Sequence, residues 1–329
     1  MVSNVRDQYQ RTIDYIRISV TDRCNLRCTY CMPEDIHLTS MSELLTFEEI
    51  VQVVGVGAEL GIRHVKLTGG EPLLRRSLPI LVQMLKNIDG IEQVTMTTNG
   101  ILLKEHLPAL LKAGLDAVNI SLDSTDRDTF RKITGFDRLD AVLAAIDAAC
   151  ASGIRTKINA VSLNLGEEAI WNLIDLAKDR PIDVRFIEMM PIGHGKDFPV
   201  YSHTKMLEQF RERYPDLTAD KTMHGFGPAV YYHIPGYQGS IGLISAIHGK
   251  FCDKCNRIRL TSTGFLKGCL CYNTGADLRE ILRANGAENE KRRHLIETME
   301  SAIYAKPRAH CFESAEDVTE RATMNEIGG

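Results

Sequence analysis

Short runs of alternating hydrophobic and polar residues separate longer stretches of helical periodicity through the first two thirds of the chain. Each run is rich in β-branched residues, and a segment long enough to form a helix separates it from the next run. This alternation of strand and helix predicts βα units, a parallel sheet and therefore an α/β fold. The six expected strands are 15–20, 64–68, 93–98, 117–122, 155–161 and 183–188.

The expected helices carry their own sequence signals. Thr46, followed three residues later by Glu49, is typical of a capping box, and Gly61 marks the end of the same helix. Two further helices are expected at 138–152 and near 203–213.

The predicted strands have one apolar and one polar face. In the first strand Ile16 and Ile18 share one side, whereas Arg17 and Ser19 share the other, and the next four strands alternate in the same way. Parallel strands that are covered on both faces normally read as continuous apolar runs. We therefore predict an open, partial (βα)6 barrel of the TIM type, whose apolar face lies under the helices and whose polar face lines a cavity.

Three cations fall on the expected polar face. Arg17, Lys66 and Lys157 have no carboxylate partner close to them in the sequence. Their convergence favours an anionic ligand in the cavity. The alternative is that they pair with Asp or Glu residues elsewhere in the chain, because buried cations normally need partners.

Composition and charge narrow the class of protein. The 329 residues are 44% hydrophobic and 25% charged, which is usual for a soluble globular protein. The 39 Lys and Arg residues are balanced by 43 Asp and Glu residues, far from the basic excess that favours nucleic-acid or membrane partners. With no long apolar run and no signal-peptide pattern, we expect a cytoplasmic protein.

The βα rhythm stops after residue 190. Pro191 begins a segment that we expect to be a long loop, and a Gly-rich region with short β-like runs, such as 230–234, starts near residue 225. We predict two domains, a partial barrel over 1–224 and a second, cysteine-containing domain over 225–329.

A first group of cysteines follows the first expected strand. In a reducing compartment such residues are more often ligands or catalytic groups than disulfides. Cys24, Cys28 and Cys31 form a C-x3-C-x2-C motif at the sheet edge where parallel α/β folds bind ligands. A structural zinc site usually needs four ligands, and His37 is the nearest candidate for a fourth. Three thiolates suit a 4Fe-4S cluster that keeps one iron open.

A second group of cysteines lies in the C-terminal region. Cys252, Cys255 and Cys269 have the spacing C-x2-C-x13-C. This spacing fits zinc as well as an iron–sulfur cluster, because Cys271 or His248 could complete a four-ligand site. Of the three cysteines outside these two triplets, Cys150 and Cys311 are expected to be packing residues.

The first motif, together with the end of the second strand, resembles the radical S-adenosylmethionine (SAM) superfamily. An aromatic residue precedes the last cysteine of the motif, and residues 68–72 read Thr-Gly-Gly-Glu-Pro, similar to the GGEP segment of that superfamily. The resemblance implies that SAM chelates the open iron and, after one-electron reduction, gives a 5′-deoxyadenosyl radical that removes a hydrogen atom from the substrate. It assigns SAM contacts to Tyr30, Gly70, Ser121 and Met190.

Nearly the entire chain resembles the GTP 3′,8-cyclase family of molybdenum cofactor biosynthesis. Residues 251–270 have that family's auxiliary-cluster spacing, and segments such as 118–123 and 185–188 are similar as well. The resemblance implies two 4Fe-4S clusters, a second cluster that binds the guanine of GTP, and 3′,8-cyclo-7,8-dihydro-GTP as product. It assigns GTP contacts to Arg17, Lys66, Thr97, Lys157, Arg257 and Arg259.

The same resemblance implies catalytic groups and partners. Arg257, Arg259 and Lys157 are the candidates for positioning the substrate and neutralising charge. The terminal Gly328 and Gly329 are expected to reach into the active site. Many relatives have Arg where this chain has Lys66, so a bidentate phosphate contact becomes a point-charge contact. The implied partners are an electron donor and the downstream cyclic pyranopterin monophosphate synthase, and the resemblance also admits a homodimer.

Two other functions are compatible with parts of the sequence. Another radical SAM enzyme with an auxiliary cluster, such as a peptide modifier, would ignore GTP. A non-catalytic zinc or iron–sulfur protein would not cleave SAM, and the GGEP segment counts against it.

Overall fold

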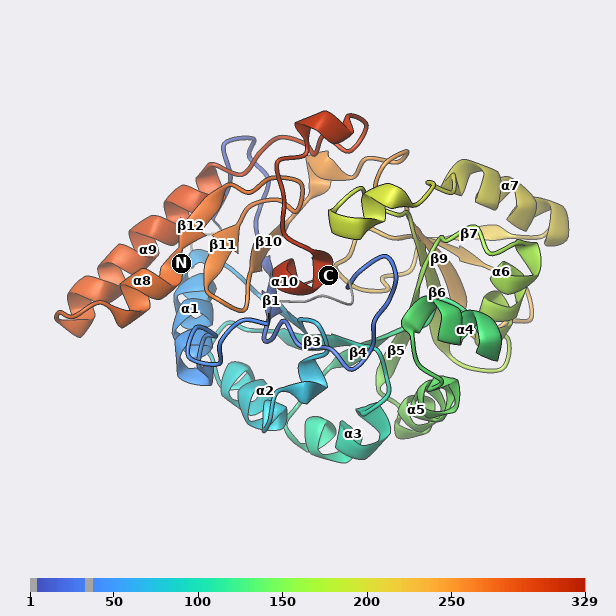
Figure 1. Ribbon diagram of the computed structural model, residues 1–329, viewed down its shortest axis with the longest axis horizontal. Helices are drawn as coiled ribbons and strands as arrows, with labels where there is room; N and C mark the ends of the chain where they lie inside the picture. The colour runs from blue at the N-terminus through green and yellow to red at the C-terminus, as the bar shows by residue number, and fades with distance from the viewer. Residues whose placement is uncertain (1–4, 33–37, 329) are drawn as a thin grey trace.

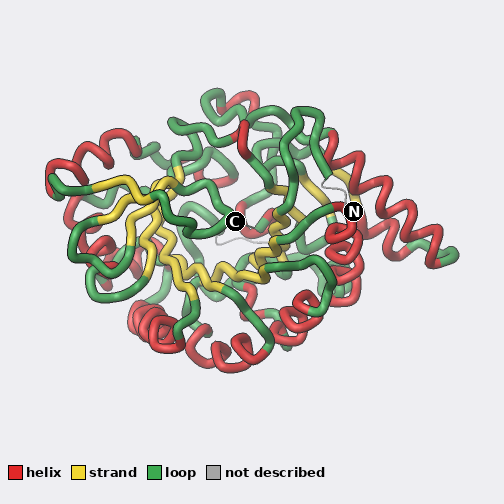
Figure 2. Tube along the Cα trace, turned by 180° about the vertical axis from the view of Figure 1, so that it is seen from behind, coloured by secondary structure: helices red, strands yellow, loops and turns green. Residues whose placement is uncertain are grey.

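The computed structural model describes residues 5–32 and 38–328 and is built around one curved sheet of 12 strands (Figures 1 and 2). Six neighbouring strands lie in sequence order and pair in parallel, which confirms the predicted partial barrel. Their ends agree with the expected ranges to within about one residue. The strands are β1 (Tyr15–Ser19), β2 (His64–Thr68), β3 (Gln93–Thr98), β4 (Ala117–Ser121), β5 (Arg155–Val161) and β6 (Ile182–Ile187).

Further strands extend the sheet beyond both edges of the barrel. They are β7 (Thr218–Asp220), β8 (Val230–His233), β9 (Ser240–Ile244), β10 (Arg257–Leu260), β11 (Phe265–Lys267) and β12 (Gly275–Asp277). β9 pairs in parallel with β6, and β10 pairs in parallel with β1, while the outermost strands are antiparallel. The C-terminal region therefore lies against both sides of the barrel. The boundary between the two predicted domains, at residues 224 and 225, remains a proposal. It falls between β7 and β8, which pair with each other.

Helices α1 to α5 lie on the outer, convex side of the curved sheet (Figure 2). The α-helices are α1 (Phe47–Leu60), α2 (Leu78–Lys86), α3 (Leu103–Lys112), α4 (Arg127–Thr134), α5 (Leu139–Ser152), α6 (Glu167–Ile174), α7 (His203–Arg213), α8 (Leu278–Arg283), α9 (Glu288–Tyr304) and α10 (Met324–Ile327). The capping box of Thr46 and Glu49 and the end of α1 at Gly61 are confirmed. α5 and α7 confirm the other two expected helices. None of the helices among the described residues combines the length and hydrophobicity needed to cross a membrane.

Short 3-10 helices mark several connections. They are η1 (Pro72–Leu74), η2 (Asp175–Ala177), η3 (Gly193–Asp197), η4 (Cys252–Lys254) and η5 (Ala315–Asp317). The connection after β6, which was expected to be a plain loop, contains η3. The short α10 brings the C-terminus back over the mouth of the barrel, above the curved sheet (Figures 1 and 2).

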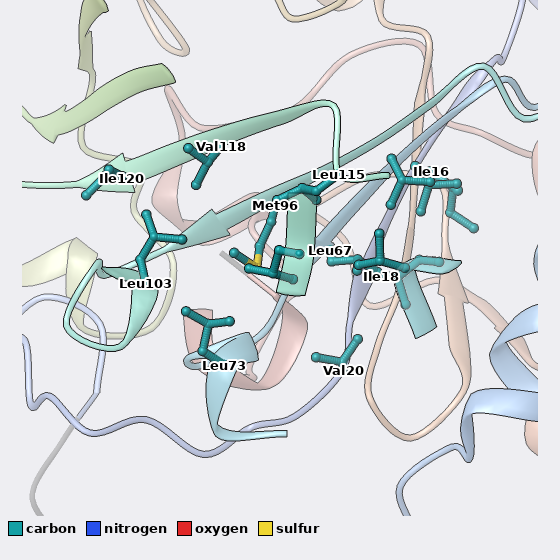
Figure 3. Packing of buried hydrophobic residues seen from close by; sticks show 14 of the residues in the cluster. Ile16, Ile18, Val20, Leu67, Leu73, Met96, Leu103, Leu115, Val118 and Ile120 are labelled. Atoms are coloured by element: carbon teal, nitrogen blue, oxygen red, sulfur yellow. The ribbon is translucent and has the colours of Figure 1, made fainter. Parts of the chain in front are cut away.

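The outward faces of the barrel strands form the main hydrophobic core. Ile16, Ile18, Leu67, Met96 and Val118 are fully buried against the covering helices (Figure 3). Each such side chain contributes roughly 1.5–3 kcal/mol to folding when it leaves water. Because side chains alternate along a strand, the same strands turn their polar residues toward the inside of the barrel.

Candidate active site

A row of cations crosses the inner face of the barrel. Arg17 on β1 is in register with Lys66 on β2 on one side and with Arg259 on β10 on the other. Burial lowers the pKa of Arg17 to about 10, and burial followed by repulsion from neighbouring cations lowers the pKa values of Lys66 and Arg259 well below their usual range. Buried like charges are costly unless an anion offsets them. The inner face is therefore suited to a polyanionic ligand.

Lys157 has a carboxylate partner that is distant in the sequence. Its ammonium lies 3.2 Å from the carboxylate of Asp183 and donates to the hydroxyl of Tyr231 at 2.9 Å and to the carbonyl of His224. For Lys157 the alternative of a distant carboxylate partner therefore holds, because Asp183 stands opposite it on β6. Burial and the nearby Arg185 lower the pKa of Lys157 to about 8, although Asp183 opposes the shift.

Arg185 is a cation of the cavity that sequence reasoning missed. It lies on β6, is only 7% exposed, and donates to the amide oxygen of Asn159. The side-chain amide of Asn119 is oriented so that its oxygen faces these cations. In this orientation the oxygen accepts hydrogen bonds from Lys66 at 2.7 Å and from Arg185 at 3.0 Å. The alternation of β6, with Val184 and Phe186 buried outward, was the signal that could have placed Arg185 on the inner face.

Several buried polar atoms in the cavity lack partners among the described residues, and two of them bear on the substrate. Thr97 Oγ1 and Arg185 Nε make no hydrogen bond to the described part of the chain. Buried polar groups are nearly always hydrogen-bonded in native proteins. These two donors fit a ligand that carries several acceptor oxygens, which is consistent with the predicted role of Thr97.

The first cysteine triplet lies on the loop that follows β1. Cys24, Cys28 and Cys31 are close enough to influence one another electrostatically, and burial, followed by Cys24 and Asp123, raises the pKa of Cys31 to about 12. Burial thus favours the protonated thiols, which must lose their protons when a metal cluster binds. The amide of Asn99 lies 3.8 Å from Cys24 Sγ, and the backbone NH of Leu26 donates to the same sulfur at 3.4 Å.

The GGEP segment connects β2 to this loop. The NH of Gly70 donates to Thr21 O at 2.8 Å, and the NH of Glu71 donates to Arg23 O at 2.7 Å. The fully buried carboxylate of Glu71 accepts from Thr98 Oγ1 and from the NH of Asn99, both at 2.7 Å. Burial raises the pKa of Glu71 to about 7. Glu71 thus joins the ends of β2 and β3 beside Cys24.

Replacing Gly70 with alanine is expected to distort the loop that carries the first triplet. A Cβ atom at Gly70 would lie 2.3 Å from Arg23 O, a backbone atom that cannot move aside alone. Such overpacking costs about 1–3 kcal/mol, and SAM binding should weaken, as measured by anaerobic equilibrium dialysis.

Gly55→Ala is the matched control for this change. A Cβ atom at Gly55, inside α1, meets nothing within 4 Å. This variant should gain about 0.5–1 kcal/mol of stability, because alanine favours helix. Equal SAM affinity in the two variants would contradict the role of Gly70.

The other residues predicted to contact SAM lie at the same edge of the sheet. Tyr30 follows the second cysteine of the motif, Ser121 ends β4, and Met190 follows β6. The hydroxyl of Tyr30 donates to Asp123 at 2.7 Å, and the NH of Val161 donates to the same carboxylate at 2.8 Å. Burial raises the pKa of Asp123 to about 6. Asp123 therefore holds the Tyr30 ring beside the triplet.

The second triplet gathers from η4 and the turn after β11. Cys252, Cys255 and Cys269 are electrostatic neighbours. Burial acts to raise the pKa of Cys255, but Arg257 and Lys306 outweigh it and lower that pKa to about 6. Arg259 also interacts electrostatically with Cys269 and Cys255. The second triplet therefore lies within electrostatic range of the cation row.

Arg11 fixes the position of η4. Its guanidinium donates to Cys252 O at 2.7 Å, to Arg308 O at 2.7 Å and to Pro307 O at 2.6 Å, and it pairs with the buried Asp7 at 2.5 Å. No signal in the local sequence pattern pointed to the contact of Arg11 with η4, because the carbonyl groups that accept from it lie more than 200 positions away.

Both triplets fit the chemistry of an iron–sulfur cluster. Among residues 5–32 and 38–328, no three His, Cys, Asp or Glu side chains are placed to hold a single metal ion. A 4Fe-4S cluster takes one thiolate on each iron, so its ligands need not meet at one ion. Two histidines were considered as alternative zinc ligands. The ring of His248 forms a hydrogen bond with the carboxylate of Glu188 at 2.8 Å, and His37 lies outside the described residues.

The C-terminal tail enters the cavity. Arg259 Nη1 donates to Gly328 O at 2.8 Å, and a Cβ atom at Gly328 would lie 2.8 Å from Thr68 Oγ1 and 2.9 Å from Ser19 Cβ. The side chain of Asn325 donates to Asp22 O at 3.3 Å, at the start of the first cysteine loop. The tail thus lies between the two triplets. Gly329 lies outside the described residues.

Two family models match this chain. The model described as the Radical SAM superfamily matches residues 18–177, and the model described as Molybdenum Cofactor Synthesis C matches residues 182–312. The first range contains Cys24, Cys28 and Cys31, and the second contains the three cysteines of the other triplet.

Curated relatives match over the full length. A GTP 3′,8-cyclase of Clostridium perfringens (strain 13 / Type A) is 43% identical over 327 residues, covering 99% of this chain and 100% of that protein. A GTP 3′,8-cyclase of Alkaliphilus oremlandii is 42% identical over 332 residues, with coverage of 99% and 100%.

Solved structures share the fold at low sequence identity. Streptococcus suis SuiB bound to S-adenosylmethionine matches with a TM-score of 0.63 and 15% identity, covering 96% of this chain and 77% of that chain. At this identity the likeness concerns the fold alone.

Proposed function

This chain belongs to the GTP 3′,8-cyclase family of radical SAM enzymes, and on that premise we propose that it converts GTP to (8S)-3′,8-cyclo-7,8-dihydroguanosine 5′-triphosphate in molybdenum cofactor biosynthesis. The observation that carries the proposal is the row formed by Arg259, Arg17 and Lys66, with the second triplet in electrostatic range of Arg259 and the first triplet on the loop that follows β1. Such a row suits a triphosphate, while an open iron on either side would serve SAM and the guanine base.

The cavity residues would bind and orient the substrate. We assign the triphosphate to Arg17, Lys66 and Lys157, and add Arg185 to this set because it faces the same amide of Asn119. Thr97 would donate its free hydroxyl to the nucleotide. Fixing the ribose and base in one orientation makes attack between two atoms of the same molecule favourable.

Residues near the two triplets would complete the site. Tyr30, Gly70, Ser121 and Met190 would hold SAM beside the cluster of Cys24, Cys28 and Cys31. When bound, the two 4Fe-4S clusters and SAM supply one-electron chemistry and a hydrogen-abstracting radical. Arg257 and Arg259 would neutralise charge beside the second cluster.

Partners and location follow from the family and are proposed with it. We propose an external one-electron donor, and cyclic pyranopterin monophosphate synthase as the enzyme that takes the product. A cytoplasmic location and a homodimer complete the proposal. The net charge of −4 gives no support to a nucleic-acid partner.

The formation of 5′-deoxyadenosine tests the proposed substrate. The protein is reconstituted anaerobically with iron and sulfide, given SAM and dithionite, and analysed with and without GTP. Strong stimulation by GTP is expected. Slow formation that ignores GTP would point to another substrate, and no formation with both clusters incorporated would overturn the enzymatic assignment.

GTP affinity is expected to fall as the pH rises above about 8. Burial and Arg185 lower the pKa of Lys157 to about 8, so its charge is present below that pH and lost above it. The attraction to a triphosphate is lost with the charge. The Kd of GTP, measured by anaerobic calorimetry, should rise by at most about tenfold per pH unit.

Lys157→Arg is the control for this pH dependence. Arginine stays charged over the whole range, so the part of the pH dependence that comes from Lys157 should be absent from this variant. An unchanged slope in Lys157→Arg would assign the titration to another group.

Replacing Gly328 with alanine is expected to separate SAM cleavage from cyclisation. The residue has φ of +76°, and an added Cβ would clash with Thr68 Oγ1 and Ser19 Cβ. The tail should leave its place against Arg259, while the first triplet stays intact. The expected result is 5′-deoxyadenosine formation with little cyclised product, measured as the ratio of the two by mass spectrometry.

Gly153→Ala is the matched control for the tail variant. Gly153 has nearly the same φ, +74°, at the end of α5, and an added Cβ meets nothing within 4 Å. It carries the same backbone strain, about 1–2 kcal/mol, without a clash in the cavity. Its product ratio should equal that of the unmodified protein, and a loss of coupling there would attribute the effect to strain alone.

A further inference from the structure

Two cysteines outside the triplets face each other. Cys271 Sγ and Cys311 Sγ are 2.8 Å apart although the residues are separated by 40 positions. The backbone NH of Cys311 donates to Cys271 Sγ at 3.3 Å. Since the sulfur atoms of a disulfide are about 2.05 Å apart, a bond between them needs a shift of less than about 1 Å.

The surroundings keep the two thiols in place. Cys271 is fully buried in a small hydrophobic cluster with Ile192, Leu270 and Phe312, whereas Cys311 is partly exposed. The NH of Glu320 donates to Cys271 O at 3.2 Å, and Lys267 pairs with the carboxylate of Glu320. The tail and the turn after Cys269 are thus already joined by hydrogen bonds and an ion pair around the two sulfurs.

We propose that Cys271 and Cys311 form a reversible disulfide that fastens the C-terminal tail to the turn after the second triplet. The link anchors the segment that leads to Gly328 and its contact with Arg259.

The oxidant is a low-molecular-weight disulfide such as oxidised glutathione. Cys311, the exposed member, attacks one sulfur of the oxidant, forms a mixed disulfide and releases one glutathione thiol. Cys271 then displaces the second glutathione. The two protein thiols lose two electrons and two protons, and one glutathione disulfide becomes two thiols, so the exchange balances without oxygen.

Anaerobic redox titration of the holoenzyme tests this disulfide. The protein with both clusters is equilibrated in glutathione buffers of increasing oxidation, trapped with iodoacetamide and digested with trypsin. The expected result is a cross-link between the peptides 268–279 and 309–321, with fragment ions that place it on Cys271 rather than Cys269. The link should approach completion in the most oxidising buffer, disappear with excess reduced thiol, and leave the iron content unchanged.

Variants identify the order of attack. In Cys271→Ser, which lacks the resolving thiol, glutathione should remain on Cys311, whereas Cys311→Ser should give no cross-link. Cys150, on α5, should never be cross-linked in the unmodified protein. The proposal would be overturned if both thiols were alkylated in every buffer. It would also be overturned by a link to Cys269, or by a link that appears only as iron is lost. None of these readouts depends on turnover of GTP, so the proposed function is tested separately.

Discussion

Cys24→Ala is expected to abolish the formation of 5′-deoxyadenosine. Cys24 lies on the loop after β1, held by Leu26 and Asn99, and shares an electrostatic environment with Cys28 and Cys31. A cluster that retains only two thiolates is poorly held and misplaced for SAM. Because removing even an outer partner of a metal ligand costs about 10–100-fold in affinity or activity, loss of a direct ligand should exceed 100-fold.

The matched control is Cys150→Ala. Cys150 packs partly buried on α5, away from the cysteine loops in sequence and fold. Its replacement should leave the iron content at about eight per chain and the rate of SAM cleavage unchanged. Normal 5′-deoxyadenosine formation by Cys24→Ala would show that the first triplet does not hold the SAM-cleaving cluster.

Cys269→Ala is expected to eliminate cyclisation while some SAM cleavage continues. The first triplet stays intact in this variant, so radical initiation remains available. The second cluster, which would hold the base near Arg257 and Arg259, loses a ligand. Iron should fall from about eight to about four per chain, and 5′-deoxyadenosine should form without cyclised product.

The neighbouring Cys271→Ala variant distinguishes a ligand from a nearby thiol. Cys271 is two residues further along the chain, and its sulfur faces Cys311. This variant should keep about eight irons per chain and form cyclised product. If Cys271→Ala lost four irons and Cys269→Ala lost none, the assignment of ligands in the second cluster would be reversed.

Local patterns in the sequence were sufficient to predict the barrel. Alternation along β1 to β5 separated the outward core residues, such as Ile16 and Leu67, from the inward cations Arg17 and Lys66. The capping box at Thr46 fixed the start of α1. These signals depend on residues a few positions apart, so they can be read without knowledge of the fold.

Contacts between distant residues could not be predicted in this way. Asp183 reaches Lys157 only because β5 and β6 are paired in a particular register. Arg11 contacts Cys252 from the other end of the chain. The pairing of Cys271 with Cys311 likewise depends on the path of the tail, which no periodicity records.

The transfer of deuterium from the ribose of GTP tests the central claim most directly. The holoenzyme is incubated anaerobically with SAM, dithionite and GTP deuterated at C3′, and the 5′-deoxyadenosine is analysed by mass spectrometry. Because hydrogen abstraction at C3′ precedes bond formation to C8, the account predicts one deuterium in 5′-deoxyadenosine together with cyclised product. Unlabelled 5′-deoxyadenosine formed alongside consumption of GTP would contradict it.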